Sequence, residues 1–570
     1  MILPTENLPH DSSTEFDIAI VGAGAVGVAI ARRLADHRFG RIVLVEAGGA
    51  RFDAEKQRRF FAAAEVSDHR HPPGDLYRRR MLGGTTSIWG GRCIPMQPED
   101  FAPTEGRTGW PIAYDDVARH YPDALEFLQA GAADFRATTA LAAIPAPACR
   151  DASGLDVDQI ERFSEPTDVW KKWGAALAHD TNVTVLHDGA CTSVITTRDG
   201  GRVVGLRLRT PSNQHRDIRA AQVVLACGGL ETPRLLLASN ETRVCGLGNE
   251  HDLVGRCYMT HLAGNFGHLR FAEAKTVRAF DYAKTPDGIY ARRLIRITPS
   301  VRESQAIGNI VFRPTIAPID DASHRDAVLS AMFLAKRLII PEYGRRLVGH
   351  GLATEHREAW SRHLVNIALG LPDLAAFGGK WLRRRILATR KLPSVFLRRT
   401  DATYPLEFNA EQSPNPDSRV LLGSETDPFG VRRLIIRWSA SDADIESVAL
   451  AYEALTAAVG RSGLGTLTLG PDSHLKIPSA VIALAGHHIG TVRMGNDPRS
   501  SVVDRNAEVW GTRGLYVCGA AIFPTSGFAN PTLTAVALAF RLADHVIQQH
   551  RQTEPVRRSS SDLELVDDRG

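Results

Sequence analysis

Three glycines, Gly22, Gly24 and Gly27, follow a short apolar run and form a GxGxxG pattern. In such a pattern the first glycine permits a tight turn, the second lets the backbone approach a pyrophosphate, and the third lets the following helix pack closely. The start of that helix adds amide donors and a positive dipole end for the phosphates. Glu46, 19 residues after Gly27, can accept hydrogen bonds from a ribose 2′-hydroxyl. The pattern predicts a dinucleotide site and does not distinguish FAD from NAD.

A strand, helix, strand unit must hold these residues. The apolar run at 16–21, a helical pattern through Leu34 and a second apolar run at 42–45 supply it. Further strand-like runs, bounded by turn residues, lie at 183–186, 192–196, 203–208, 223–226 and 515–518, and a helix is expected over 532–549. The nucleotide-binding part is therefore expected to be discontinuous. Runs over 290–316 and 403–438 predict an antiparallel sheet in a second lobe.

The expected fold class is α/β, or α+β overall, with an FAD/NAD(P)-binding Rossmann-like domain and a substrate domain built on an antiparallel sheet. We assign the nucleotide domain to 15–100, 176–260 and 481–550, a substrate or lid region to 101–175, the substrate domain to 261–480, and a disordered tail to 551–570.

The composition is ordinary for a soluble globular protein, with 44% apolar and 23% charged residues. No run approaches the ~18 apolar residues that suggest a membrane span. The polar start of the chain, with Glu6, Asp11 and Glu15, argues against a secretory signal. The seven cysteines include no CxxC pair, so we expect reduced thiols, a cytoplasmic location and no metal site. A formal net charge of +4 gives no indication of nucleic acid binding.

Four more motifs follow the glycine pattern in order, at 81–92, 226–239, 487–495 and 529–534. Together the five motifs resemble the glucose-methanol-choline (GMC) oxidoreductase family, and most closely its pyranose oxidase-like, sugar-oxidising members. The resemblance spans residues 17 to about 547. It implies the GMC oxidoreductase fold and FAD, rather than NAD, as the cofactor.

The resemblance also implies which residues contact FAD. Gly83 and Gly84 would let the backbone pass close to the isoalloxazine ring, and the main chain at Cys191 would meet the adenine. The remaining expected contacts are Ala25, Thr85, Ser87, Ala226, Gly519, Ala520, Asn530, Pro531 and Thr532. Pyranose oxidases commonly link the flavin to a His where this chain has Ile88. Because an Ile cannot form that bond, we expect non-covalent FAD.

For the chemistry, the resemblance matches His487 to the family's catalytic His and Asn530 to its partner. Removing a hydride from an alcohol carbon also requires a base for the hydroxyl proton, and a neutral imidazole, with an ordinary pKa of ~6.5, is suited to that task. His488 is the rival base and a candidate substrate contact, although adjacent residues of an extended segment point opposite ways. Gln412 could hold a sugar hydroxyl or cap the turn after it, and His261 raises the same question.

Residues 326–400 carry 14 Lys or Arg against 5 Asp or Glu, interspersed with large apolar side chains. This basic helical insert is compatible with peripheral contact to an anionic membrane. The interpretation we favour is a packed helical cover with solvated arginines.

The sequence thus predicts an enzyme that oxidises a hydroxyl of a sugar, aminosugar or glycoside to a carbonyl, by hydride transfer to flavin N5 with His487 as base. Oxygen, a quinone or a protein remain open as electron acceptors. The alternatives are a non-redox FAD-containing lyase of the same family, an NAD-dependent dehydrogenase, and a flavin-containing scaffold protein attached to membranes.

Overall fold

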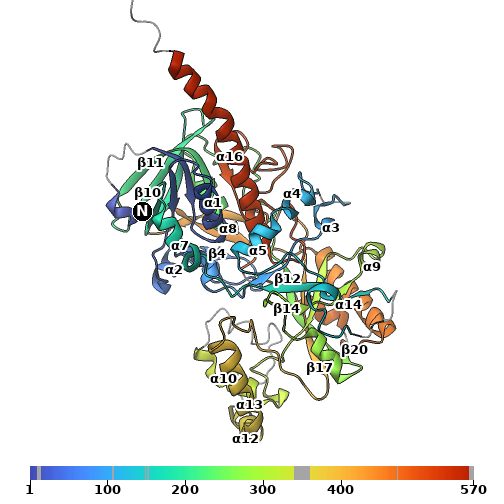
Figure 1. Cartoon of the computed structure of the whole chain (residues 1–570). Coiled ribbons are helices and arrows are strands. Elements are labelled where there is room, and N and C mark those ends of the chain that lie inside the picture. The colour runs from blue at the N-terminus through green and yellow to red at the C-terminus, as the bar shows by residue number, and fades with distance from the viewer. Residues whose placement is uncertain are drawn as a thin grey trace, which may run out of the picture.

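The computed structural model describes residues 1–8, 15–104, 108–147, 149, 153–338, 360–470, 473–484 and 486–563. Figure 1 shows a body of strands and helices around the N-terminus, a second body beneath it that contains β12 (Leu262–Phe271) and β17 (Thr403–Ala410), and a small helical lobe at the far end.

The first body is built on a largely parallel sheet. In the described part of the chain the sheet has eight strands, seven in the order β1-β8-β3-β2-β11-β10-β9 and β22 beside β11. Their bounds are β1 (Ile2–Pro4), β2 (Glu15–Val21), β3 (Ile42–Val45), β8 (Val183–His187), β9 (Ala190–Thr196), β10 (Val203–Arg209), β11 (His215–Leu225) and β22 (Leu515–Val517). The predicted strands and the discontinuity of this domain are confirmed, and the structure adds β1.

Helices explain why the short strand β3 is buried along its whole length. α1 (Ala25–Asp36) packs against β3 and against α16 (Pro531–Leu563). Arg33 of α1 and Asp544 of α16 form an ion pair at 2.8 Å. Parallel strands covered in this way read as continuous apolar runs, which is the pattern the sequence shows.

The second body contains the predicted antiparallel sheet. β16 (Ile310–Pro314), β17, β12 and β20 (Gly465–Thr468) are neighbours in that order, and β21 (Ile482–Ala483) lies beside β12. The long helix α14 (Asp442–Ser462) packs on this sheet. Its Tyr452 ring lies 5.2 Å from the ring of Phe312 and 5.8 Å from that of Phe408, so aromatic packing joins the helix to the sheet.

The register of this sheet brings distant segments to one end. Leu262 is paired with Ala410 of β17 and with Ala483 of β21. His261 precedes Leu262, Gln412 follows Ala410 by two residues, and His487 follows Ala483 by four. Three segments far apart in sequence therefore meet at one edge.

Smaller elements connect the two bodies. β7 (Ile160–Phe163), inside the region assigned as a lid, pairs with both β5 (Arg92–Cys93) and β14 (Tyr290–Arg293). A further sheet has the strand order β18 (Arg419–Thr426), β19 (Arg432–Arg437) and β4 (Glu65–Val66), and the remaining helices near the cavity include α2 (Ala54–Phe61), α7 (Val169–His179) and α8 (Gly228–Ala238).

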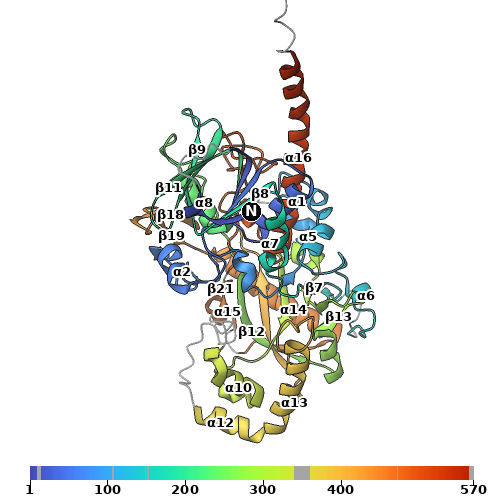
Figure 2. The same cartoon turned by 60° about the vertical axis from the view of Figure 1, so that its left-hand side comes forward.

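The basic insert forms the helical lobe seen at the bottom of Figure 2. It contains α10 (Ala327–Leu334), α12 (Trp360–Leu369), α13 (Leu371–Trp381) and a π-helical turn (Leu382–Ile386). Among the described residues, no helix has the length and apolar character needed to cross a membrane.

One expectation about the C-terminal segment is wrong. Residues 551–563 belong to α16 rather than to a disordered tail, and Figure 1 shows this helix projecting past the sheet. Low hydrophobicity predicts that a segment will not pack, but a helix that is already nucleated can propagate by one hydrogen bond per residue. Residues 564–570 lie outside the described residues.

Candidate active site

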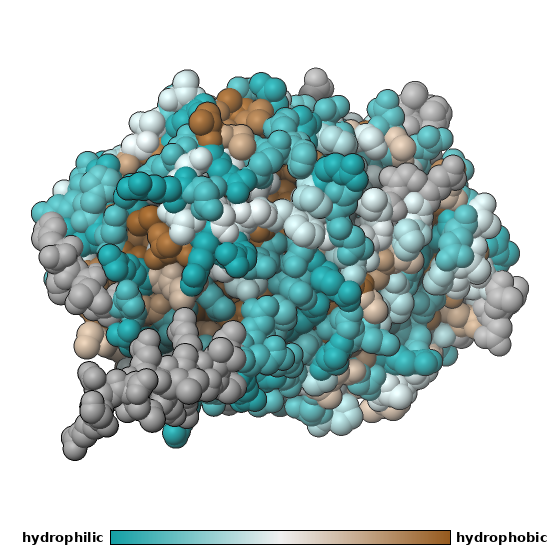
Figure 3. Space-filling model, turned by 90° about the horizontal axis from the view of Figure 1, so that it is seen from above, coloured by the Kyte–Doolittle hydropathy of each residue, from teal (hydrophilic) through white to brown (hydrophobic). Residues whose placement is uncertain are grey.

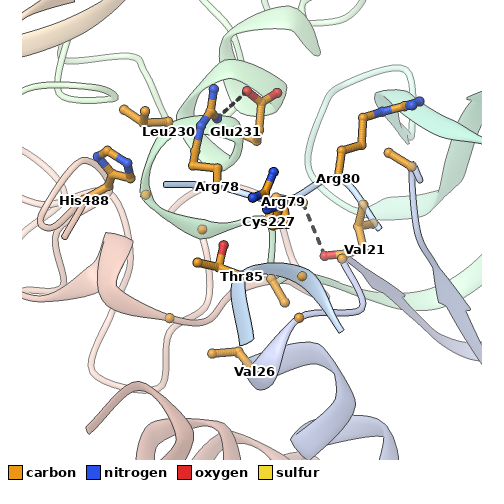
Figure 4. Close-up of a pocket in the computed structure, with 18 of the residues that line it drawn as sticks. Val21, Val26, Arg78, Arg79, Arg80, Thr85, Cys227, Leu230, Glu231 and His488 are labelled. Carbon is orange, nitrogen blue, oxygen red and sulfur yellow. Dashed lines mark hydrogen bonds and ion pairs between the residues drawn. The ribbon is translucent and has the colours of Figure 1, made fainter. Parts of the chain in front are cut away.

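A cavity of about 310 Å³ lies between the glycine turn after β2, the start of α8 and the start of α16 (Figure 4). This volume falls within the range of small-molecule sites. Twelve residues expected to contact FAD line the cavity: Gly22, Gly24, Ala25, Glu46, Gly84, Thr85, Cys191, Ala226, Gly519, Ala520, Pro531 and Thr532. Motifs that are far apart in the sequence therefore line one cavity.

The glycines of the first turn fit a bound dinucleotide. Gly22 has φ of +103°, and a Cβ there would lie 2.7 Å from the carbonyl oxygen of Ala226. A Cβ on Gly27 would lie 1.8 Å from the oxygen of Gly22, so this glycine is needed for helix packing. Gly24 differs because a Cβ there would meet no protein atom within 4 Å, although the residue lines the cavity. A side chain at Gly24 would occupy the space that a pyrophosphate needs, next to the start of α1.

Glu46 lines the same cavity at the end of β3. Its carboxylate accepts hydrogen bonds from the backbone N–H of Ala23, at 3.0 Å, and of Gly48, at 2.9 Å. Burial raises the pKa of Glu46 to about 7, while these two backbone bonds act in the opposite direction. The carboxylate is thus fixed beside the glycine turn, where it can accept further hydrogen bonds from ribose hydroxyls.

Charged residues that sequence reasoning did not select form another part of the wall. Arg78 and Arg234 hold Glu231 between them, at 2.8 and 3.0 Å, and Arg234 also binds Asp427 at 2.8 Å. Figure 4 shows the pair of Arg78 and Glu231 beside His488. The run of three arginines at 78–80, directly before the glycine-rich loop, was a visible signal for this network.

The catalytic candidates form a hydrogen-bonded chain at the end of the second sheet. His487 Nδ1 lies 2.6 Å from His261 Nδ1, and His487 Nε2 lies 3.0 Å from Asn530 Nδ2. On its other side His261 Nε2 lies 3.1 Å from the carbonyl oxygen of Ser526. The structure thus brings His487 and Asn530 together as predicted and adds His261 as a direct partner.

The chemistry of these partners assigns the protons. The Ser526 carbonyl can only accept, so His261 Nε2 carries the hydrogen and His261 Nδ1 is an acceptor. Burial lowers the pKa of His261 to about 4, which keeps this ring neutral. His487 must then donate from Nδ1, and its Nε2 holds a lone pair that accepts from the Asn530 amide. Both ends of the chain require the same tautomer of His487.

His488 belongs to a second chain of bonds. His71 Nδ1 lies 2.7 Å from the Pro72 oxygen, and the Tyr258 hydroxyl lies 2.8 Å from His71 Nε2 and 2.6 Å from His488 Nδ1. Because the Pro72 carbonyl only accepts, the same reasoning leaves the lone pair of His488 on Nε2.

His488 Nε2 is buried without a partner among the described residues, and the side chain lines the FAD cavity. Burial, with the charges of Arg78 and His71, holds the pKa of His488 well below its usual range. A buried acceptor facing a cavity indicates a ligand that donates there.

Other predicted residues have structural roles. Gln412 Oε1 accepts from the Thr260 N–H and the Trp438 indole, both at 2.9 Å, and its Nε2 donates to the Ser439 oxygen at 2.8 Å. Gln412 Oε1 already accepts two hydrogen bonds and the side chain is buried, which favours a role in holding loops together over binding a substrate hydroxyl.

Two residues of the glycine-rich loop, Gly83 and Ser87, stand outside the cavity lining. A Cβ on Gly83 would lie 2.5 Å from the carboxylate of Asp168, at the start of α7, and the Ser87 hydroxyl donates to the oxygen of Gly84 at 2.9 Å. Both therefore shape the loop that presents Gly84 and Thr85 to the cavity. No cluster of three or more His, Cys, Asp or Glu suited to a metal ion occurs within the described ranges.

Two family models described as GMC oxidoreductase match the chain, one over residues 162–263 and the other over residues 414–539. Together they cover strands β8 to β11 and β22 of the nucleotide sheet, His261, and the segment of His487 and Asn530.

Characterised relatives share part of the chain. The large subunit of fructose dehydrogenase from Gluconobacter japonicus is 24% identical over 62% of this chain, and the match spans 52% of that relative. C-glycoside 3-oxidase from Microbacterium trichothecenolyticum is 33% identical over 25% of this chain and 26% of its own length. The chain thus matches about half, or less, of the length of these two relatives.

The fold is shared with solved structures as well. Pyridoxine 4-oxidase from Mesorbium loti superposes with a TM-score of 0.53 at 17% sequence identity, covering 93% of this chain and 99% of that one. At this identity the likeness concerns the fold alone.

Proposed function

We propose that the chain, which two GMC oxidoreductase family models match over residues 162–263 and 414–539, belongs to that family and oxidises a hydroxyl group of a sugar, aminosugar or glycoside to a carbonyl, with FAD as the non-covalent cofactor. The observation that carries the proposal is the position of the His487 ring, whose Nδ1 lies 2.6 Å from His261 Nδ1 and whose Nε2 lies 3.0 Å from Asn530 Nδ2.

The cavity residues fit FAD. The turn at Gly22 and Gly24 would hold the pyrophosphate, Glu46 the ribose, and the segment of Gly84 and Thr85 the flavin end. When bound, FAD supplies the acceptor for the hydride that leaves the alcohol carbon. Ile88 offers no nucleophilic atom for a covalent bond to the flavin, which supports the non-covalent form.

The chain's own residues handle the proton. An alcohol that enters between His487 and Asn530 would donate its hydroxyl hydrogen to His487 Nε2 and accept a hydrogen bond from Asn530 Nδ2, because these atoms now bind each other at 3.0 Å. As the hydride departs, the hydroxyl proton passes to Nε2 and the oxygen becomes a carbonyl oxygen. His261 then accepts from the opposite edge of the charged ring and holds it in place. His261 is thus a positioning residue.

The substrate class rests on the relatives. Fructose dehydrogenase and C-glycoside 3-oxidase, by their names, act on a sugar and on glycosides. An anaerobic screen of sugars, aminosugars, glycosides and simple alcohols for bleaching of the bound flavin tests this class. Adding oxygen or a quinone to the bleached enzyme and following flavin reoxidation then identifies the electron acceptor. Failure of every alcohol to bleach the flavin would reject the redox function and favour a lyase.

The base is tested by replacing His487 with alanine. Because a positioned general base contributes about 10²–10⁴ in rate, His487→Ala should keep its flavin and lose at least about a hundredfold in kcat. His69→Ala is the matched control, since the His69 side chain is 93% exposed on the surface. Parental turnover by His487→Ala would reject this residue as the base.

A further inference from the structure

The helical lobe carries most of the exposed large hydrophobic side chains in the part of the chain that the structure describes. Eight of the thirteen exposed large hydrophobic residues in the described part of the chain fall within residues 360–387: Trp360, Leu364, Val365, Leu369, Leu371, Leu382, Ile386 and Leu387. We call these eight side chains, with the basic residues named below, the lobe patch. Figure 3 views the opposite end of the molecule, which is predominantly hydrophilic with small apolar areas.

In α12 the polar side faces the protein and the apolar side faces outward, the opposite of a helix that packs on a hydrophobic core. His363 is fully buried, its ring stacks on Phe333 at 4.1 Å, and its Nδ1 lies 3.0 Å from the Ser330 hydroxyl. Asn366 on the same side donates to the oxygen of Ala322 at 2.9 Å. Leu369, by contrast, is 81% exposed. The helix is therefore anchored by polar groups and presents its apolar side outward.

Helical geometry places the outward residues together. Leu364, Val365 and Leu369 project on the side of α12 away from His363, and Trp360 borders them with its ring 5.5 Å from that of Phe333. A packed cover, the interpretation favoured from sequence, accounts for α10, which buries Phe333, but leaves this side of α12 unexplained. Exposed apolar groups in such number indicate an interaction surface.

Basic side chains border these apolar groups. Arg362, Lys380, Arg383 and Arg384 are exposed in the same stretch, which has Asp373 as its acidic residue. Apolar side chains beside surface cations are the pattern of a segment that inserts its apolar groups at the lipid boundary and leaves its cations at anionic headgroups. We propose that the lobe patch binds the surface of an anionic membrane without crossing it.

A second copy of the chain is the less suitable occupant. A twofold dimer would use the same patch on both subunits, which would bring Arg383 and Arg384 of one copy toward those of the other. Like charges at close range repel, whereas anionic lipid headgroups neutralise them. The proposal does not depend on the proposed catalytic function, because neither His487 nor the FAD cavity takes part in it.

The test uses the full-length protein with its flavin and sucrose-loaded vesicles. Phosphatidylcholine vesicles with about 30 mol% phosphatidylserine should sediment the protein at about 0.1 M salt, and binding should weaken at about 0.5 M. Vesicles of phosphatidylcholine alone should bind far less. Absence of binding to the anionic vesicles at low salt would overturn the proposal.

Variants locate the surface. Arg383→Gln with Arg384→Gln should lower the partition coefficient roughly 30-fold, about fivefold for each cation. Leu364→Asp with Leu369→Asp should lower it further by removing the inserted groups. Val244→Asp, at a side chain that is 93% exposed and follows α8, far from the lobe in sequence, should bind vesicles as the parent does.

Retained flavin and a parental melting temperature establish that the variants fold. Parental vesicle binding by both lobe variants would reject this surface. Light scattering tests self-association. If the parent is a dimer that does not bind vesicles, and Leu364→Asp with Leu369→Asp makes it a monomer, the lobe patch is a dimer interface and the membrane proposal is rejected.

Discussion

Replacing His261 with phenylalanine removes the acceptor of the His487 Nδ1 hydrogen while keeping a ring of similar shape at a fully buried position. The Nδ1 donor would then be left unsatisfied, at a cost of about 1–3 kcal/mol, and Nε2 would no longer be the fixed site of the lone pair. If that cost falls on the proton-transfer step, kcat should decrease about 5- to 150-fold. KM and flavin content should change little, because His261 is separate from the FAD cavity lining.

Anaerobic stopped-flow bleaching of the flavin with the best sugar substrate measures this effect. His261→Gln is the rescue variant, since a glutamine can accept from His487 through Oε1 and donate to the Ser526 carbonyl through Nε2. It should recover most of the lost rate. His268→Phe, at an exposed position on β12, the strand that begins directly after His261, is the matched control. A parental bleaching rate in His261→Phe, or equal losses in His261→Phe and His261→Gln, would refute the positioning role.

Three further predictions concern the cofactor and stability. Gly24→Val should leave the apoprotein's melting temperature unchanged and weaken FAD binding at least about tenfold. Gly22→Ala should lower both the melting temperature and the affinity for FAD, because only at Gly22 would a Cβ collide with backbone, the carbonyl oxygen of Ala226. Denaturation should release all flavin from the chain, since Ile88 forms no bond; mass spectrometry detecting flavinylated protein would contradict this. Burial lowers the pKa of His71 to about 4 in the folded protein. As the pH drops from 6.5 to 4, the imidazole is therefore protonated in the unfolded chain before it is protonated in the folded one, and the folded state loses stability. In denaturant titrations, the free energy of unfolding of His71→Gln should fall by about 3 kcal/mol less than that of the parent between pH 6.5 and pH 4.

Much of the fold could be predicted because local pattern and tertiary role agree. The runs that form β2, β3, β8 and β22 are apolar throughout, as strands covered on both faces must be. β1 could not be predicted, because its three residues are ordered by pairing with β8, a partner about 180 residues away. The end of α16 was missed for a different reason, since its composition predicts solvation and does not report on helix propagation.

The cofactor site was more predictable than the base site. Its glycines are required by the turn itself, so they occur at fixed spacing within one short segment. His261, by contrast, acts only through the register that pairs Leu262 with Ala410 and with Ala483, and no spacing in the sequence encodes that register. The partners of Gln412, Thr260 and Trp438, also come from other segments, so the sequence alone does not encode its hydrogen bonds.

The adjacent histidines show how one extended segment can serve two environments. Ile489, the next residue, exchanges two backbone hydrogen bonds with Met259, each at 2.9 Å, which holds the segment extended. Successive side chains of extended backbone point opposite ways, so His487 reaches Asn530 while His488 reaches the FAD cavity. In each ring the chain of partners takes up Nδ1 and leaves the lone pair on Nε2.

This arrangement separates the two roles that the sequence left in competition. For His488, a second proton on Nε2 is disfavoured by burial beside Arg78 and His71, so it is suited to accept a hydrogen bond from a bound ligand. His487 donates from Nδ1 to the neutral ring of His261, and its Nε2 faces the amide of Asn530. A proton gained at Nε2 therefore leaves the hydrogen bond to His261 in place. That difference in surroundings, rather than residue type, is the physical reason for proposing His487 as the base.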